Sequence, residues 1–273
     1  MDAAAPKAVL LESGSLVFVS VPIMLAIIGG SGLTQLSSLD VSRQQVVRTP
    51  YGEPSGALTF GRIGTQDVVF LARHGYGHTI PPHLVNYRAN IWALTEGAGA
   101  RSIVSVASVG GIRADLAPGM LLVPHQIIDY TWGRASSFHD RQDAQVVHID
   151  FTEPYDAELR QKLLDAAARA GENVLDGAVY AVSQGPRLET AAEITRFERD
   201  GADVVGMTGM PEAALAREAD VPYAALNVVA NWAAGRGDSA RAIQFDTLEA
   251  VLQSALAQVR NVISHFCESG NCP

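Results

Sequence analysis

Short runs of mostly apolar residues alternate with longer amphipathic segments along most of the chain. The apolar runs are residues 25–28, 68–72, 102–107, 121–123, 178–182, 203–205 and 224–230. Runs of this length that are apolar at consecutive positions are typical of strands buried on both faces of a sheet. They predict a sheet that lies in the interior of the protein.

Helical periodicity fills the segments between these runs. Apolar residues recur at three- and four-residue spacing in residues 86–96, 156–170, 189–199, 211–219 and 247–266. Strands that alternate with helices in this way build a parallel sheet covered by helices. We therefore expect a single α/β domain with a central, mainly parallel, mixed β-sheet flanked by helices.

The first residues of the chain need a separate interpretation. The apolar run 23–28 predicts a first strand that begins near Met24, and the apolar stretch before it is interrupted at residues 12–15. About 18 unbroken apolar residues are needed to cross a bilayer, so we interpret this stretch as neither a signal peptide nor a membrane helix. The expected organisation is an N-terminal extension (1–23), one domain (24–266) and a C-terminal tail (267–273).

Composition narrows the class of protein. The chain has 273 residues, 48% of them hydrophobic, which excludes a disordered chain. With 20 Lys+Arg against 29 Asp+Glu the formal net charge is −9, which argues against binding to nucleic acid or to an anionic membrane surface. The two cysteines, Cys267 and Cys272, lie in the predicted tail. They hold no disulfide framework and are too few for a structural metal site, which fits a cytoplasmic protein without metal.

Glycine and polar residues collect where the predicted strands end. Gly29-Gly30-Ser31-Gly32, Arg73-His74-Gly75 and Gly206-Met207-Thr208 each follow a strand, and we interpret residues 105–111 as a further small-residue turn. Open α/β sheets place ligands at the carboxyl ends of their strands. Backbone N–H, hydroxyl, imidazole and guanidinium groups together suit an anion. Any one of these turns could be a structural connection, but the four together predict one anion site.

Five motifs, in this order and at compatible spacing, resemble the trimeric purine nucleoside phosphorylase and methylthioadenosine phosphorylase family. They are residues 27–33 (IIGGSGL), 73–75 (RHG), 85–90 (VNYRAN), 184–190 (QGPRLET) and 206–212 (GMTGMPE). The similarity extends from about Met24 to Phe266. It implies a homotrimeric pentosyltransferase that cleaves a purine nucleoside with inorganic phosphate as co-substrate and without a cofactor.

The resemblance also implies roles for individual residues. The phosphate-binding residues are Ser31, Arg73, His74, Thr208 and the backbone amide of Ser108, and Met207 contacts the ribose. In this family phosphate attacks the anomeric carbon through an oxocarbenium-like transition state. Positioning and charge stabilisation therefore dominate, and no protein nucleophile is needed. The catalytic residues inferred in this way are His74, Glu189 and Asn231.

The purine is expected to lie between Glu189 and Asn231. Adenine-type members have an Asp-x-Asp arrangement where this chain has Asn231 and Ala233. An amide can donate to N7 and to a 6-oxo oxygen, and a glutamate can accept the N1–H that only a 6-oxopurine carries. This pair predicts a 6-oxopurine nucleoside. The structural alternative is that Asn231 only caps its strand and Glu189 only opens a helix.

The 5′ end of the nucleoside is expected at the start of the last helix. Ordinary purine nucleoside phosphorylases have a histidine there, whereas this chain has Phe245 and, one turn on, Leu248. Burying a methylthio group gains about 1–2 kcal/mol, and burying a hydroxyl without a partner costs about 1–3 kcal/mol. A dry apolar wall therefore favours the thioether, unless Phe245 is simply a core residue. His148 matches a residue that methylthio-specific members supply from a neighbouring subunit.

These observations predict a cytoplasmic phosphorylase of S-methyl-5′-thioinosine that yields hypoxanthine and 5-methylthioribose 1-phosphate in purine salvage. The alternatives within the enzyme class are a methylthioadenosine phosphorylase and a general inosine and guanosine phosphorylase. A non-catalytic nucleoside-binding protein is the alternative from another class. The retained set of phosphate-binding side chains argues against it, because a sensor has no need of a dianion site.

Overall fold

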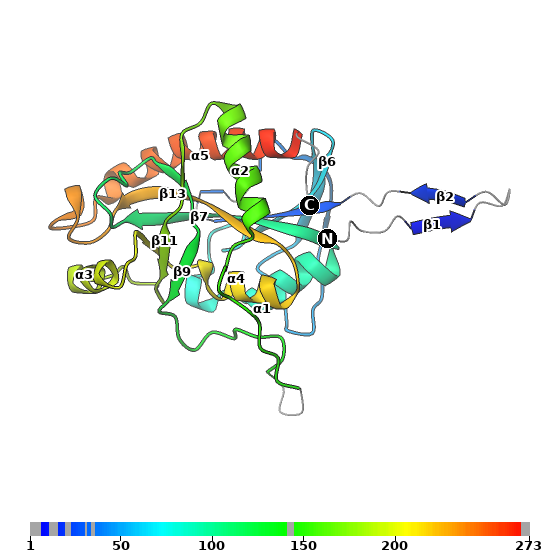
Figure 1. The fold of residues 1–273 in the computed structure, drawn as a ribbon, viewed down its shortest axis with the longest axis horizontal. Helices are drawn as coiled ribbons and strands as arrows, with labels where there is room; N and C mark the ends of the chain where they lie inside the picture. Colours follow the sequence, from blue (N-terminus) through cyan, green and yellow to red (C-terminus); the bar gives the residue numbers. More distant parts are fainter. Residues whose placement is uncertain are drawn as a thin grey trace.

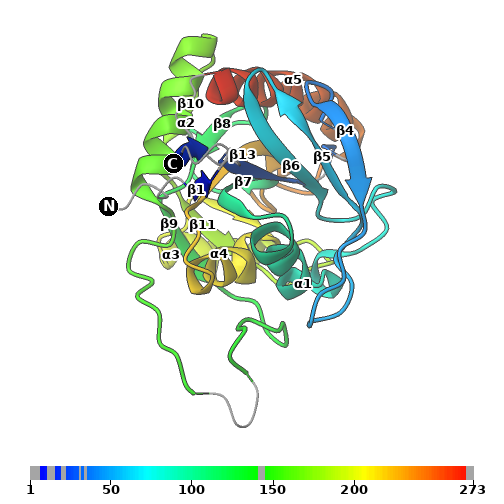
Figure 2. The same ribbon diagram turned by 90° about the vertical axis from the view of Figure 1, so that its right-hand side faces the viewer.

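The computed structural model describes residues 7–10, 16–19, 23–30, 32–33, 36–140 and 145–268, with the side chains of 7–10, 16–19, 246 and 247 left out. An eleven-stranded sheet lies between two layers of helices (Figures 1 and 2). Its strands are β3 (Met24–Gly29), β4 (Asp40–Gln45), β5 (Leu58–Ile63), β6 (Gln66–Ala72), β7 (Ala100–Gly111), β8 (Leu121–Val123), β9 (Gln126–Asp129), β10 (Val174–Asp176), β11 (Val179–Val182), β12 (Val204–Gly206) and β13 (Tyr223–Trp232). The α-helices are α1 (Tyr87–Trp92), α2 (Ala157–Ala170), α3 (Ala191–Arg199), α4 (Gly209–Glu218) and α5 (Phe245–Glu268).

The sheet is mixed, with a parallel centre. β7 is parallel to β3 and β13, and β3 is parallel to β6. β5 and β4 continue antiparallel beyond β6, while β8 pairs antiparallel with β13 and parallel with β10. β12 pairs antiparallel with the end of β7 and leads to β11 and β9. The predicted fold class is confirmed.

Successive residues of the central strands pack into opposite helical layers. In β3, Leu25 and Ile27 belong to a buried cluster shared with α2 and α5, whereas Ala26 and Ile28 belong to a cluster shared with α1 and α4. Figures 1 and 2 show α2 and α5 on one face of the sheet and α1 and α4 on the other. A strand covered on both faces needs apolar residues at every position, which explains the runs in the sequence.

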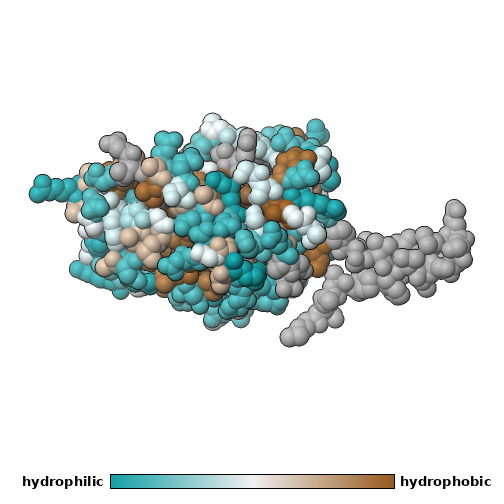
Figure 3. Space-filling model, turned by 90° about the horizontal axis from the view of Figure 1, so that it is seen from above, coloured by the Kyte–Doolittle hydropathy of each residue, from teal (hydrophilic) through white to brown (hydrophobic). Residues whose placement is uncertain are grey.

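The helices that cover the sheet are amphipathic. The outer face over α2 and α5 is mainly hydrophilic, with small separate hydrophobic patches (Figure 3). α5 continues to Glu268, past the predicted end of the domain, and Cys267 is buried in the same cluster as Val259 and Ile263. Cys267 is therefore a helical core residue rather than part of a tail, because it continues the apolar face of α5. Cys272 lies outside the described residues.

One predicted turn is wrong, because residues 105–111 continue β7 without interruption. Their small side chains allow close packing instead. A Cβ on Gly111 would lie 2.2 Å from the carbonyl oxygen of Leu116, and one on Gly110 would lie 3.3 Å from Val205. The end of β7 therefore lies closer to Leu116 and Val205 than larger side chains would permit.

Two strands that precede Met24 form a small sheet of their own. β1 (Lys7–Leu10) and β2 (Leu16–Val19) pair antiparallel with each other in a separate two-stranded sheet. Figure 1 shows this hairpin extending away from the body of the molecule. The main sheet begins at Met24, as the apolar pattern predicts. Within the described part of the chain, no helix is long and apolar enough to cross a membrane.

Candidate active site

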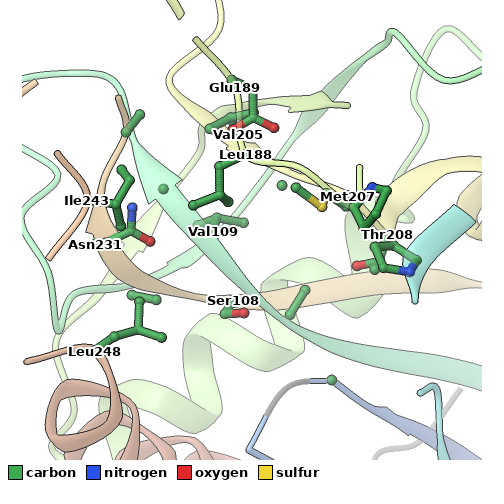
Figure 4. Close-up of a pocket in the computed structure, with 18 of the residues that line it drawn as sticks. Ser108, Val109, Leu188, Glu189, Val205, Met207, Thr208, Asn231, Ile243 and Leu248 are labelled. Carbon is green, nitrogen blue, oxygen red and sulfur yellow. The ribbon is translucent and has the colours of Figure 1, made fainter. Parts of the chain in front are cut away.

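A cavity of about 960 Å³ opens at the carboxyl ends of the parallel strands. The predicted site residues that line it are Arg73, His74, Ser108, Glu189, Met207, Thr208, Asn231, Phe245 and Leu248. Figure 4 shows Met207 and Thr208 on one side, Asn231, Ile243 and Leu248 on the other, Glu189 above and Ser108 below. Both the size and the position are typical of small-molecule sites in α/β proteins.

The other predicted side chains are Ser31 and His148, of which Ser31 lies outside the described residues. His148 is exposed and does not line the cavity of its own chain. The expectation that His148 acts in a neighbouring subunit therefore remains a prediction.

Arg73 follows β6 and is fully buried. Its Nε donates to Oε2 of Glu212 at 2.7 Å, and its Nη2 donates to Oε1 at 2.9 Å. Nη2 also donates to Ser105 Oγ at 2.6 Å, and Nη1 donates to the carbonyl of Val106 at 3.0 Å. Of the five guanidinium N–H groups, one on Nη1 has no partner among the described residues.

The guanidinium group that the sequence assigns to an anion site also has a counter-ion within the protein. Glu212 occupies one edge of the guanidinium, because a fully buried cation requires a counter-charge. Tyr223 and Ser105 also donate to Oε1 of Glu212, each at 2.8 Å. Burial disfavours the charged guanidinium, but the carboxylate outweighs burial and raises the pKa of Arg73. Arg73 therefore offers the cavity a fixed charge and one N–H.

His74 is a neutral hydrogen-bond acceptor at neutral pH. Its Nδ1 lies 2.8 Å from the carbonyl oxygen of Ile80. Since a carbonyl only accepts, Nδ1 carries the hydrogen and Nε2 keeps its lone pair in the neutral ring. Burial, with the positive charge of Arg73, lowers the pKa of His74 to about 4. Nε2 can therefore accept a hydrogen bond from a hydroxyl of a bound anion or sugar.

Met207 and Thr208 follow β12, and a buried tyrosine supports them. The backbone N–H of Thr208 donates to Tyr180 Oη at 3.4 Å. A Cβ on Gly206 would lie 2.5 Å from that oxygen, and one on Gly209 would lie 2.8 Å from the ring. Both positions therefore need glycine, which lets the ring of Tyr180 pack directly beneath the turn. This packing fixes Thr208 at the cavity wall.

Glu189 lies at the upper side of the cavity in Figure 4. Its Oε1 accepts the hydroxyl hydrogen of Ser183, the residue that follows β11. Burial raises the pKa of Glu189, while the hydrogen bond from Ser183 acts in the opposite direction. Helix α3 begins with a capping box made by Thr190 and Glu193, so Glu189 is not needed to open this helix.

Asn231 lies near the end of β13, on the side of the cavity opposite Met207 (Figure 4). Its Nδ2 donates to the carbonyl of Trp232 at 2.6 Å. One amide N–H and the amide oxygen remain for a ligand. Donation to N7 and to a 6-oxo oxygen at the same time, as the sequence suggested, requires that the bond to Trp232 be released.

Phe245 and Leu248 line the cavity from the first turn of α5. Phe245 is 65% exposed, so it is not a core residue. The expectation of a dry pocket closed by a neighbouring subunit remains a prediction, since no described element of this chain covers the outer side of the ring. The single chain supplies an apolar wall here and leaves it open.

Arg134 has a position that the sequence did not reveal. It lies in residues 132–147, whose described parts contain neither helix nor strand. Nη1 donates to the carbonyls of Met207 at 2.8 Å and Met210 at 2.5 Å, and Nη2 donates to those of Gln184 at 2.8 Å and Ser183 at 3.3 Å. Arg134 thus joins the segments that carry Met207 and Ser183. An isolated arginine in a loop gives no local pattern that would predict this.

Known proteins resemble this chain over most of its length. Residues 24–268 match the family described as the Phosphorylase superfamily. A "Probable S-methyl-5'-thioinosine phosphorylase" of Pseudomonas syringae pv. tomato is 50% identical over 239 residues, which cover 88% of this chain and 96% of that protein. The 6-oxopurine nucleoside phosphorylase of Pyrococcus furiosus is 45% identical over 216 residues, covering 77% and 80%. The solved methylthioadenosine phosphorylase of Schistosoma mansoni in complex with adenine has a TM-score of 0.85 at 31% identity, covering 90% and 91%.

Proposed function

This chain belongs to the phosphorylase superfamily, and we propose that it cleaves S-methyl-5′-thioinosine with inorganic phosphate. The products are hypoxanthine and 5-methylthioribose 1-phosphate, so the enzyme is a pentosyltransferase of purine salvage. Phosphate is the co-substrate, and no cofactor takes part. The names of relatives that are 45% and 50% identical support the 6-oxopurine and the methylthio group.

The observation that carries this proposal is that one cavity is lined both by groups suited to phosphate and by groups suited to the edge of a purine. Arg73, His74 and Thr208 line it together with Glu189 and Asn231. In the proposed reaction an oxygen of hydrogen phosphate bonds to the anomeric carbon as the glycosidic bond breaks, and the purine leaves with the bonding electrons. The purine gains a proton at N7, which balances the proton that the phosphate loses. A dianion held beside the developing sugar cation stabilises this transition state.

The base is selected by its hydrogen-bonding edge. The carboxylate of Glu189 accepts the N1–H of a 6-oxopurine, and the remaining N–H of Asn231 donates to the purine. A 6-aminopurine has no hydrogen on N1, so the carboxylate meets a lone pair. Sites that leave buried polar groups unpaired with the wrong ligand discriminate by several orders of magnitude.

The 5′-methylthio group is placed against Phe245 and Leu248. Because Phe245 is 65% exposed in the single chain, we propose that a neighbouring subunit of a homotrimer covers it and that His148 belongs to the covering segment. The location of both cysteines in the last seven residues of the sequence is consistent with a cytoplasmic enzyme.

The test is a comparison of S-methyl-5′-thioinosine, S-methyl-5′-thioadenosine and inosine with the purified protein, with and without phosphate. We expect phosphate-dependent release of hypoxanthine, with the highest kcat/KM for methylthioinosine. Release of adenine at an equal rate would point to a methylthioadenosine phosphorylase, and preference for inosine to a general enzyme. Nucleoside binding without release of a base would overturn the proposal in favour of a binding protein.

A further inference from the structure

We propose that Ser183 is a positioning residue that orients Glu189 and thereby sets the choice between 6-oxo and 6-amino purines. This inference rests on the proposed function, because it assumes that Glu189 contacts the purine. Ser183 is 8% exposed, and its backbone N–H donates to the carbonyl of Gly206 at 2.8 Å. The backbone of Ser183, just after β11, is therefore held against the end of β12, and this fixes the position from which the hydroxyl extends.

The hydrogen bond from Ser183 fixes one oxygen of the carboxylate. Oε1 of Glu189 accepts the Ser183 hydroxyl, which leaves Oε2 for a ligand. The backbone after Glu189 is fixed as well, since Thr190 donates its N–H to Oε2 of Glu193 at 2.7 Å. A long, mobile side chain is thus held at both ends, as a site that reads one atom of a base requires.

Nearby charges do not take over this role. Arg187 pairs with Glu193 at 2.7 Å rather than with Glu189. Arg134 contacts the carbonyl of Ser183 at 3.3 Å and binds the backbone rather than the carboxylate. Among the described residues, the hydrogen bond from Ser183 is therefore the side-chain contact that holds Glu189.

The hydroxyl also shifts the protonation equilibrium of Glu189 toward the carboxylate. Ser183 has one hydrogen and two acceptors within reach, Oε1 of Glu189 and the carbonyl of Gly206 at 3.4 Å. A hydrogen bond to the carboxylate favours the ionised form, against burial, which favours the neutral form. The ionised form is the stronger acceptor for the N1–H of a 6-oxopurine. The neutral acid can instead donate to the bare N1 of a 6-aminopurine.

Removal of the hydroxyl should therefore change a pH profile as well as a rate. In Ser183→Ala the acid limb of kcat/KM for methylthioinosine should move up by about one pH unit, which is about a tenfold loss below the limb. The ratio of methylthioinosine to methylthioadenosine cleavage should fall by a similar factor. Ser183→Thr keeps the hydroxyl and should restore the parental limb.

The experiment measures kcat/KM for both nucleosides between about pH 5 and 9. The enzymes compared are the parent, Ser183→Ala, Ser183→Thr, Glu189→Gln and the double variant Ser183→Ala/Glu189→Gln. Since Ser183 acts through Glu189, Ser183→Ala should change little in the Glu189→Gln background. Ser42→Ala removes a hydroxyl that bonds to the Phe60 carbonyl at 3.1 Å in edge strand β4, and it serves as the matched control.

Two outcomes separate this inference from the proposed function. If Glu189→Gln leaves kcat/KM for methylthioinosine unchanged, Glu189 does not read the base and the inference fails, whereas the proposed function fails if the parent releases no hypoxanthine from methylthioinosine with phosphate. If Glu189→Gln is impaired but Ser183→Ala keeps the parental acid limb, only the inference fails. Ser183→Cys has a side chain of similar size with a weaker hydrogen-bond donor. If Ser183→Ala does not fold, an acid limb of Ser183→Cys at a higher pH than that of the parent supports the inference, and an unchanged limb overturns it.

Discussion

Arg73 and Glu212 are joined by two parallel hydrogen bonds of 2.7 and 2.9 Å, and neither side chain is exposed to solvent. The two residues are 139 positions apart in the sequence, so the pair ties the end of β6 to α4. The charge that faces the cavity is thus held in place by a partner that never reaches the cavity itself.

The first prediction concerns this pair. Glu212→Gln leaves a buried guanidinium without its counter-charge, which should cost about 3–5 kcal/mol of the free energy of unfolding. The same change should raise the KM for phosphate, because the cation loses its fixed position. Urea unfolding and phosphate saturation measure the two effects. The exposed pair of Arg62 and Asp67 provides the control, since Asp67→Asn should cost less than about 1 kcal/mol.

The second prediction concerns the base. Asn231→Asp should narrow the gap between methylthioinosine and methylthioadenosine, because a carboxylate accepts from a 6-amino group where the amide N–H donates. The parent should separate the two nucleosides by several orders of magnitude in kcat/KM. Steady-state kinetics with both substrates check this. Equal cleavage of the two by the parent would remove Asn231 and Glu189 as readers of the purine.

The third prediction concerns the 5′ substituent. With its outer side covered by a neighbouring subunit, the apolar wall should favour methylthioinosine over inosine by about 2–4 kcal/mol, or about 30- to 1,000-fold. Phe245→His should reduce this preference by giving the 5′-hydroxyl a hydrogen-bond partner. His148→Ala should reduce it by exposing the 5′ pocket of the neighbouring subunit to water. A parent enzyme that already prefers inosine contradicts the assignment.

The fourth prediction concerns the N-terminal extension. A chain that begins at Met24 should fold and turn over normally, because β1 and β2 pair only with each other in the sheet and the main sheet begins at this residue. The truncation removes the carbonyl of Ile23, which accepts from Gln66 Nε2 at 2.5 Å, at a cost of about 1 kcal/mol. Thermal unfolding and activity of the short chain test this. Insoluble or inactive protein would show that the extension supports the fold.

The fifth prediction concerns pH. The folded chain takes up a proton on His74 only near pH 4, whereas the unfolded chain does so near 6.5. The unfolded state therefore binds more protons between these values, and this group lowers the free energy of unfolding as the pH falls from about 6.5 to about 4. His74→Gln should show a smaller loss of stability over that window in urea unfolding. Parallel curves for the two proteins would mean that His74 titrates normally.

Local pattern predicted the parallel centre of the sheet and the edge on which the cavity lies. Strands β3, β6 and β13 are apolar at consecutive positions because helices cover both of their faces. Strand β4 gave no such signal, since all six of its residues are exposed. The small residues at the end of β7 predict a turn, although they continue the strand, because a short side chain suits a turn and close packing equally well.

Contacts between distant parts of the chain could not be predicted from pattern. The motif containing Arg73 placed this residue at the site, but nothing near it in sequence shows that Glu212 takes one edge of its guanidinium. The exposure of Phe245 likewise depends on which elements cover it in space. Ser183 and Arg134 have ordinary sequence surroundings, and only the folded chain shows what they contact.

The hydrogen bonds of Arg134 to the backbone bear on how related proteins can differ in sequence. Its two terminal nitrogens bind four carbonyl oxygens, which every amino acid carries. Side chains at Ser183, Met207 and Met210 can therefore be exchanged while this support is retained. Homologues are free to acquire new nucleoside preferences by changing those side chains, and the scaffold beneath them is inherited intact.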